Sequence, residues 1–364
     1  MQASKDLIRQ LPNLDQLSES LGQDTGEIVD RAFAGRSRPG PAGEEEVSFG
    51  IGGGVLGVAG GAPEVEETNR ERWVRAGVRA VNKLKTQGET ADLTGEEVIG
   101  LEAIVHIECR PAILVQDGHF FPPPDKWKFL EQERGKIEAN CARVGRIELT
   151  GHPSYEWVGT GFLVSENVIM TNRHVAQIFC KMGRRRRWAF ETGITARIDY
   201  VEELGAQVSE EFALTRVIGV HEDFDMAVFK VDKVSSTGVK APQPMAVSSQ
   251  PPSDFTGRMV YCVGYPAWDG YRNDPDAIRK IFSNIFDVKR LQPGEIMSFM
   301  EAQKQFMHDC STLGGNSGSC VIDIETDQVI GLHFGGRYQQ GNYAVALWEL
   351  TNDPLIKKAK VNYV

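Results

Sequence analysis

The pattern of apolar and polar positions changes once along the chain, near residue 144. Upstream, apolar residues recur at helical spacing with charged residues between them, namely Trp73, Val74, Val78, Val81 and Leu84. This spacing lets one face of a helix be buried. Downstream, short apolar runs are separated by turn residues. The change predicts a helical N-terminal part and a β-rich C-terminal part.

The β-rich part contains runs with the length and composition typical of strands. These runs are VGRIELT, GTGFLV, NVIMT, LTRVIGV, MAVFKV, MVYCVGY, SCVIDI, QVIGLHF and YAVALW. Many short strands without alternating helices favour an antiparallel sandwich or a pair of barrels over a parallel α/β sheet. The last stretch, WELTNDPLIKKAKV, favours a closing helix.

Composition divides the chain into four segments. Residues 1–36 have a helical character, and residues 37–66 are rich in glycine, proline and glutamate, as linkers are. Residues 67–143 return to helical periodicity, and we expect this extension to pack on or regulate the domain formed by residues 144–364. The apolar tract Val47–Pro63 is shorter than the about 20 residues of a membrane span. We therefore expect no membrane contact.

The overall balance of charge is acidic, with a net charge of -10 and a pI near 5.3. This argues against a nucleic-acid partner, and the short basic run Arg184–Arg187 is typical of a solvated loop. A hydrophobic content of 41% and a charged content of 25% are those of a globular protein. The N-terminal stretch MQASKDLIRQ lacks the apolar core of a secretory signal, which predicts a cytoplasmic location.

Cysteine spacing adds little to this picture. The six cysteines form no CxxC pair and no zinc-like spacing. They are Cys109, Cys141, Cys180, Cys262, Cys310 and Cys320. We expect reduced thiols, since a Cys310–Cys320 bridge would require an exported chain. The sequence thus predicts neither a metal site nor a cofactor.

Three segments of the β-rich part carry residue types that together support nucleophilic catalysis. They are TNRHVA with His174, HEDFDMAVFKV with Asp225, and CSTLGGNSGSC with Ser317. A serine hydroxyl needs a base within hydrogen-bond reach, and the base needs a carboxylate that fixes its tautomer. Asp223 competes with Asp225 for the carboxylate role. We prefer Asp225 because it directly precedes the apolar run.

The glycines around Ser317 fit the same chemistry. Acyl transfer passes through an oxyanion that backbone N–H groups stabilise when the chain curls around it. The N–H groups of Gly315 and Ser317 would form such an oxyanion hole. Gly314 and Gly315 permit the required backbone angles, and Gly318 leaves room beside the nucleophile.

Over roughly residues 144–350, the chain resembles the chymotrypsin-fold (trypsin-like) serine peptidases, in particular the bacterial glutamyl endopeptidases. The resemblance is carried by TNRHVA, DFDMAVFKV and GGNSGS in the family order. It implies two antiparallel six-stranded β-barrels, here preceded by an α-helical extension. It also implies a serine endopeptidase that cleaves peptide bonds of a protein or peptide substrate through an acyl-enzyme.

The resemblance extends to the pocket for the side chain before the scissile bond. Thr312 lies on the wall of that pocket, and His333 stands where the glutamyl branch carries a pocket histidine. The floor position, Ser311, is not an aspartate, which disfavours cleavage after lysine or arginine. A hydroxyl and an imidazolium would bind a substrate carboxylate, so we expect a preference for Glu, with Asp weaker. The strand that includes Gly335 and Gly336 would pair with the substrate backbone.

Two other classes of function are compatible with parts of the sequence. A catalytically idle peptide-binding or scaffold module would have no need of a complete triad. An α/β-hydrolase esterase would require the order Ser, Asp, His and a strand–GxSxG–helix setting, which is not found here.

The role of the N-terminal part has two open interpretations. In the first, its helices bind a regulatory protein partner or pack on the barrels. In the second, the enzyme cuts its own chain after Glu46 in GEEEV and presents Val47 as a new N-terminus.

Overall fold

The computed structural model of the chain describes residues 63–88, 91–104, 110–183, 187–268, 282, 284–337 and 341–364. The predicted segment 1–36, most of the predicted linker, the Glu46–Val47 bond and Cys109 lie outside these residues. The chain divides into two compact units, Met1–Ile104 and Val105–Val364. The second unit therefore begins well before residue 144, where the sequence pattern had placed the start of the β-rich domain.

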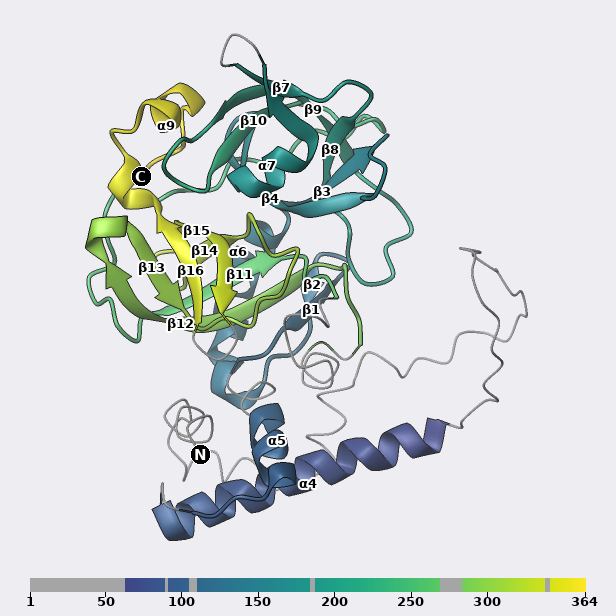
Figure 1. Ribbon diagram of the computed structural model, residues 1–364, viewed down its shortest axis with the longest axis vertical. Coiled ribbons are helices and arrows are strands. Elements are labelled where there is room, and N and C mark those ends of the chain that lie inside the picture. The colour runs from purple at the N-terminus through teal and green to yellow at the C-terminus, as the bar shows by residue number, and fades with distance from the viewer. Residues whose placement is uncertain are drawn as a thin grey trace. The chain divides into compact units, whose positions relative to one another are not determined.

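The described part of the first unit is a pair of helices, α4 (Pro63–Gln87) and α5 (Gly95–Ile104) (Figure 1). The predicted helix is confirmed, although α4 already begins inside the predicted linker. The buried positions of α4 include Ala76, Ala80, Val81 and Leu84. No helix in the described part of the chain combines the length and the apolar character needed to cross a membrane.

A capping box starts α5, and one of its residues also binds a lysine of α4. The Glu97 N–H donates to Thr94 Oγ1 (3.3 Å), while the Thr94 N–H donates to Glu97 Oε2 (2.9 Å). Lys83 of α4 donates to the same Glu97 oxygen at 2.8 Å. The hydrogen bond from Lys83 and those from Thr94 outweigh the effect of burial and lower the pKa of Glu97.

The first half of the second unit is a closed six-stranded antiparallel barrel with the order β10-β5-β4-β3-β8-β9. Its strands are β3 (Val144–Thr150), β4 (Trp157–Ser165), β5 (Val168–Thr171), β8 (Thr195–Asp199), β9 (Glu211–Val220) and β10 (Ala227–Val231). Helix α7 (Arg173–Phe179) and the hairpin of β6 (Cys180–Met182) and β7 (Trp188–Phe190) follow β5. In β9, Phe212 and Leu214 are buried in the core of this barrel, while Ala213 and Thr215 are exposed, as the alternation of side chains along a strand requires.

The second half is built on a sheet with the order β11-β14-β15-β16-β13-β12-β1-β2, which an additional β11–β12 pairing closes into a second six-stranded barrel. Its strands are β11 (Met259–Gly264), β12 (Arg290–Met300), β13 (Gln305–His308), β14 (Cys320–Asp323), β15 (Gln328–Arg337) and β16 (Gly341–Ala346), with the short helix η5 (Glu301–Gln303) after β12. The predicted architecture of two chymotrypsin-like barrels after a helical region is confirmed.

The prediction that the segment before residue 144 is helical is wrong in part, because this segment also contains strands. It forms β1 (Ile113–Gln116), β2 (His119–Phe120), the 3₁₀ helix η4 (Asp125–Glu133) and α6 (Arg134–Cys141). Strand β1 pairs with β12, so this segment extends the sheet of the second barrel. Asn140 of α6 also donates to the buried Tyr261 hydroxyl at 2.9 Å. The segment is thus built into the β unit.

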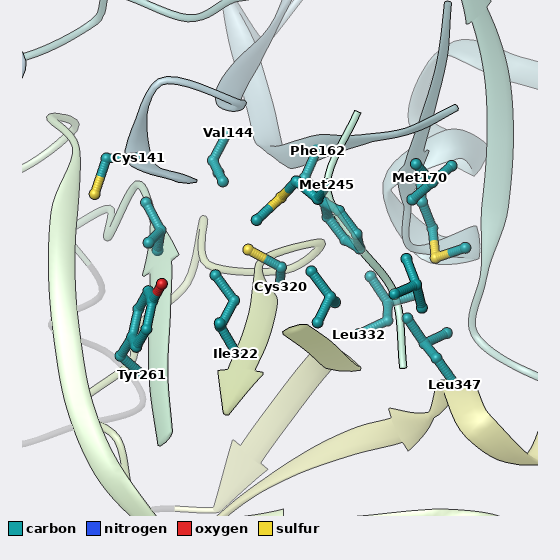
Figure 2. Close-up of a cluster of buried hydrophobic side chains, with 14 of the residues drawn as sticks. Cys141, Val144, Phe162, Met170, Met245, Tyr261, Cys320, Ile322, Leu332 and Leu347 are labelled. Carbon is teal, nitrogen blue, oxygen red and sulfur yellow. The ribbon is translucent and has the colours of Figure 1, made fainter. Parts of the chain in front are cut away.

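A hydrophobic core joins the two barrels (Figure 2). Phe162 and Met170 come from the first barrel, and Tyr261, Cys320 and Leu332 come from the second. These side chains are 0% exposed. The packing fixes the barrels against each other, so loops at their junction can hold a site built from both.

The chain ends with the 3₁₀ helix η6 (Leu347–Leu350) and α9 (Pro354–Ala359), which confirms the predicted closing helix in part. The Asp353 side chain caps α9 by accepting from the N–H groups of Leu355 and Ile356. The described cysteines are free and buried, including Cys310 and Cys320, as expected for reduced thiols.

Candidate active site

Strand pairing in the first barrel brings His174 and Asp225 together. His174 lies in the first turn of α7, directly after β5, and Asp225 precedes β10, which pairs with β5. His174 Nδ1 lies 2.6 Å from Asp225 Oδ2, and the His174 N–H donates to Asp225 Oδ1 at 2.9 Å. The carboxylate therefore fixes both the ring and the backbone of the histidine.

The surroundings of Asp225 keep it ionised. Burial by itself would raise the pKa of Asp225, but the hydrogen bonds and the charge of His174 outweigh it and lower this pKa. Asn172 fixes the same turn, since its Nδ2 donates to the Asp225 carbonyl at 2.9 Å. The competing Asp223 is exposed, and its N–H donates to His221 Nδ1. The geometry thus favours Asp225 as the partner of His174.

The Ser317 turn belongs to the second barrel but is fixed by a strand of the first. The Thr160 N–H in β4 donates to the Ser317 carbonyl at 2.9 Å, and Thr160 Oγ1 donates to the Gly315 carbonyl at 2.8 Å. The Ser317 side chain makes no hydrogen bond with another described residue, His174 included. The backbone of the turn is thus fixed while its hydroxyl stays available.

Two glycines of this turn are required by conformation and by space. Gly315 has a φ of 84° and Gly318 a φ of 94°, values that favour glycine. A Cβ at Gly315 would lie 2.3 Å from the Tyr265 carbonyl oxygen, and one at Gly318 would lie 2.0 Å from the Thr160 carbonyl oxygen. Larger residues would therefore displace the turn from β4.

The turn presents two backbone donors. The N–H groups of Gly315 and Ser317 have no acceptor in the part of the chain that the structure describes, whereas that of the intervening Asn316 donates to the Leu313 carbonyl. Two such donors beside a serine have the chemistry of an oxyanion hole.

The predicted pocket residues lie on neighbouring strands and loops. The Gly318 N–H donates to the His333 carbonyl (3.1 Å), which places β15 beside the Ser317 turn. Thr312 Oγ1 donates to Asn342 Oδ1 (2.7 Å), and Asn342 faces Gly336 across the β15–β16 pair. A Cβ at Gly335 would meet open space, so the strand is not covered at this position.

The state of His333 differs from the expected imidazolium. The side chain is 2% exposed, and its Nδ1 lies 3.2 Å from Nε2 of the equally buried His308. Burial, and to a lesser extent the charge of His174, lower the pKa of His333 to about 3. The ring is therefore neutral near pH 7. Its Nε2 makes no hydrogen bond with another described residue.

Sequence reasoning missed several residues that shape the site. Thr160 fixes the Ser317 turn, Asn342 links Thr312 to the Cys310 carbonyl through a 2.6 Å hydrogen bond, and His308 supports His333. Their roles depend on strand pairing, which the local sequence does not record. Ser311, the predicted floor residue, donates its hydroxyl to the Arg110 carbonyl at 2.7 Å.

Comparison with known proteins agrees with this geometry. Residues 159–332 match the family model of the trypsin-like peptidase domain. This stretch is thus similar to the trypsin-like peptidase domain. A probable serine protease of Lysobacter enzymogenes is 27% identical over 300 residues, which are 72% of this chain and 76% of that protein.

Solved structures of proteases are also similar to this chain. The active form of the Rv3671c protease from M. tuberculosis has a TM-score of 0.41 and 18% identity, over 62% of this chain and 84% of that chain. A serine endoprotease from Yersinia pestis has a TM-score of 0.42 and 15% identity, over 62% of this chain and 65% of that one.

Proposed function

We propose that this trypsin-like serine protease is an endopeptidase that uses His174, Asp225 and Ser317 and prefers Glu before the scissile bond. The observation that carries the proposal is the His174–Asp225 pair beside a fixed serine turn with two unused N–H donors. Asp225 accepts from His174 Nδ1, which leaves Nε2 as the proton acceptor for Ser317.

The chemistry then follows the usual course of acyl transfer. Ser317 Oγ attacks the peptide carbonyl carbon while its proton passes to His174 Nε2. The oxyanion accepts from the N–H groups of Gly315 and Ser317. His174 then protonates the leaving amine, and a water repeats the sequence on the acyl-enzyme. The step needs Ser317 Oγ within reach of His174, a contact that often tightens only when substrate is bound.

The preference for glutamate rests on His333. A neutral imidazole can donate its Nε2–H to a substrate carboxylate, so the ring need not be protonated first. The Thr312 hydroxyl donates to Asn342 in the free protein and would have to rotate to contact the substrate. We therefore expect His333 to contribute more to the preference than Thr312.

Reaction with a fluorophosphonate probe tests the nucleophile. Wild type should be labelled on Ser317, and Ser317→Ala should lose both the label and the peptidase activity, by about 10⁶-fold. Ser165→Ala, at the end of β4, is the control and should keep both. A wild-type chain that stays unlabelled and cleaves no peptide would instead support an idle peptide-binding module.

Cleavage of a proteome-derived peptide library tests the specificity. We expect cuts after Glu, and fewer after Asp. His333→Ala should lower kcat/KM for a Glu substrate by about 10–100-fold, the value of one hydrogen bond to a charged group, and change a matched Gln substrate less. Preference for Arg, Lys or large apolar residues would refute the glutamate assignment while leaving the peptidase assignment intact.

A further inference from the structure

The interior of the second barrel holds a cluster of potential metal ligands whose two thiols have no role in the proposed active site. The ligand atoms of Cys262, His308 and Cys310 all lie within 4.8 Å of one another, and the three side chains are buried. Cys262 lies on β11, His308 ends β13, and Cys310 follows two residues later. These are thiol and imidazole donors, the groups that bind zinc.

A second observation points to a ligand at the same place. His308 is 0% exposed, and its Nδ1 is buried without a hydrogen-bond partner among the described residues. Its other nitrogen, Nε2, already contacts His333 Nδ1 at 3.2 Å. An unpaired nitrogen in an apolar interior is unfavourable unless something binds it. Nδ1 is the nitrogen that His308 has left for the cluster.

A fourth donor faces the cluster from β12. Gln292 lies directly opposite Cys262 in the β11–β12 pair, so both side chains point to the same face. Gln292 Nε2 donates to the Ser311 carbonyl at 2.6 Å, while its buried Oε1 has no partner in the described part of the chain. Gly294, also on β12, makes the required space, since a Cβ there would lie 2.8 Å from Cys310 Sγ.

We propose that Cys262, Cys310 and His308 bind a structural Zn²⁺ ion, with Gln292 Oε1 in the fourth position. Most of the surrounding side chains are apolar, among them Val260, Ile296, Phe306 and Trp348. The partly buried carboxylate of Asp309, next to Cys310, accepts from the Glu295 N–H at 2.6 Å. In such an interior a bound ion is best neutralised by its own ligands. Zn²⁺ with two thiolates is neutral, whereas Cu⁺ would leave one negative charge. On binding, each thiol loses one proton to solvent, so that one zinc ion replaces two protons.

The ion would also determine the proton positions in the pocket. With Nδ1 on zinc, His308 carries its proton on Nε2 and donates it to His333 Nδ1. His333 then carries its own proton on Nε2, the nitrogen available to the substrate carboxylate. This consequence rests on the proposed function, whereas zinc binding itself does not.

The test measures zinc in the full-length chain, purified under reducing conditions and dialysed against zinc-free buffer after adding one equivalent of Zn²⁺. We expect one zinc per chain by elemental mass spectrometry, and about two protons released per ion in weakly buffered solution. Replacement by Co²⁺ should give thiolate-to-cobalt charge-transfer absorption and the visible bands of a tetrahedral site. Wild-type protein that retains no zinc, or whose cobalt form lacks the thiolate bands, would overturn the proposal.

Variants locate the site. Cys262→Ser and Cys310→Ser should lose the zinc, whereas Cys320→Ser, a buried thiol outside the cluster, should keep it. His333→Ala removes only the partner of a ligand and should weaken zinc binding about 10–100-fold. If the serine variants fail to fold, His333→Ala and the cobalt spectrum of wild type still decide the question. A Cys262–Cys310 disulfide in reduced preparations, found by mass spectrometry of the unreduced chain, would also refute the site.

One further variant separates this proposal from the peptidase. Ser317→Ala should retain one zinc per chain and lose activity. Zinc without activity in wild type would refute the proposed function alone, and activity without zinc would refute the metal site alone.

Discussion

Asp225 contacts His174 through both carboxylate oxygens. Replacing the carboxylate by an amide of the same shape tests whether its charge and its hydrogen-bond acceptor are needed. Asp225→Asn keeps the shape but removes an acceptor for His174 Nδ1–H, so the imidazole is held in the wrong tautomer to accept the Ser317 proton. We expect kcat to fall by about 10⁴-fold at neutral pH with the fold retained. Steady-state kinetics together with circular dichroism check this, and near-wild-type kcat would contradict the role of Asp225.

The same residue should contribute to acid sensitivity. The folded-state pKa of Asp225 is lowered, so its stabilisation is complete above its unfolded pKa and is lost as pH falls through the folded value. Below about pH 4, the free energy of unfolding of wild type should therefore fall more steeply than that of Asp225→Asn. Urea unfolding at pH 5, 4 and 3 measures the difference, and parallel curves would show that Asp225 contributes nothing.

At the scale of single residues, the sequence predicts those side chains whose chemical role allows only a few residue types. His174, Asp225 and Ser317 could be read from short motifs because nucleophilic catalysis admits few residue types. The cluster of Cys262 and His308 could not be predicted from the sequence, because the two residues come together only when β11, β12 and β13 pair. The neutral state of His333 was also missed, since burial is a property of the packed barrel.

At the scale of elements, strand β4 acts as the support of the Ser317 turn. Thr160→Val keeps the volume of the side chain but removes the hydroxyl that donates to the Gly315 carbonyl and accepts from the Tyr265 N–H. The loss of one oxyanion-hole donor costs about 10²–10³-fold in kcat, and an indirect loss of alignment should cost less. We expect kcat to fall by about 10–100-fold with KM little changed.

The matched control is Thr215→Val on the exposed side of β9, which should leave both constants unchanged. An unchanged kcat in Thr160→Val would show that the turn maintains its shape without β4. A raised KM with an unchanged kcat would instead place Thr160 in substrate binding.

Elements with clean apolar runs were predicted well, and irregular ones were not. The run VGRIELT coincides with β3, whereas β12 was missed because Pro293 and Gly294 interrupt its pattern. Gly294 is required by Cys310, which packs over it from a distant segment. Strand β1 was hidden in a region that reads as helical, and it is defined by its pairing with β12.

At the scale of the whole molecule, the β unit begins at Val105 and not at residue 144. Part of the segment that we predicted to be an N-terminal extension therefore belongs to the β unit. Residues 110–143 contribute a strand and buried side chains to the second barrel, so they are structural. The regulatory or partner-binding role that the sequence predicts for the N-terminal part is therefore proposed for the residues that precede the β unit.

We propose that the enzyme cuts its own chain after Glu46, in the GEEEV sequence outside the described residues. An enzyme that prefers glutamate would find three consecutive Glu residues in a segment rich in glycine and proline, a composition favourable to proteolysis. Wild type should show a new N-terminus at Val47 by mass spectrometry. Ser317→Ala should stay uncut, and so should a chain with Glu44, Glu45 and Glu46 replaced by Gln. An intact wild-type chain with full peptidase activity would reject self-processing and leave partner binding as the role of this segment.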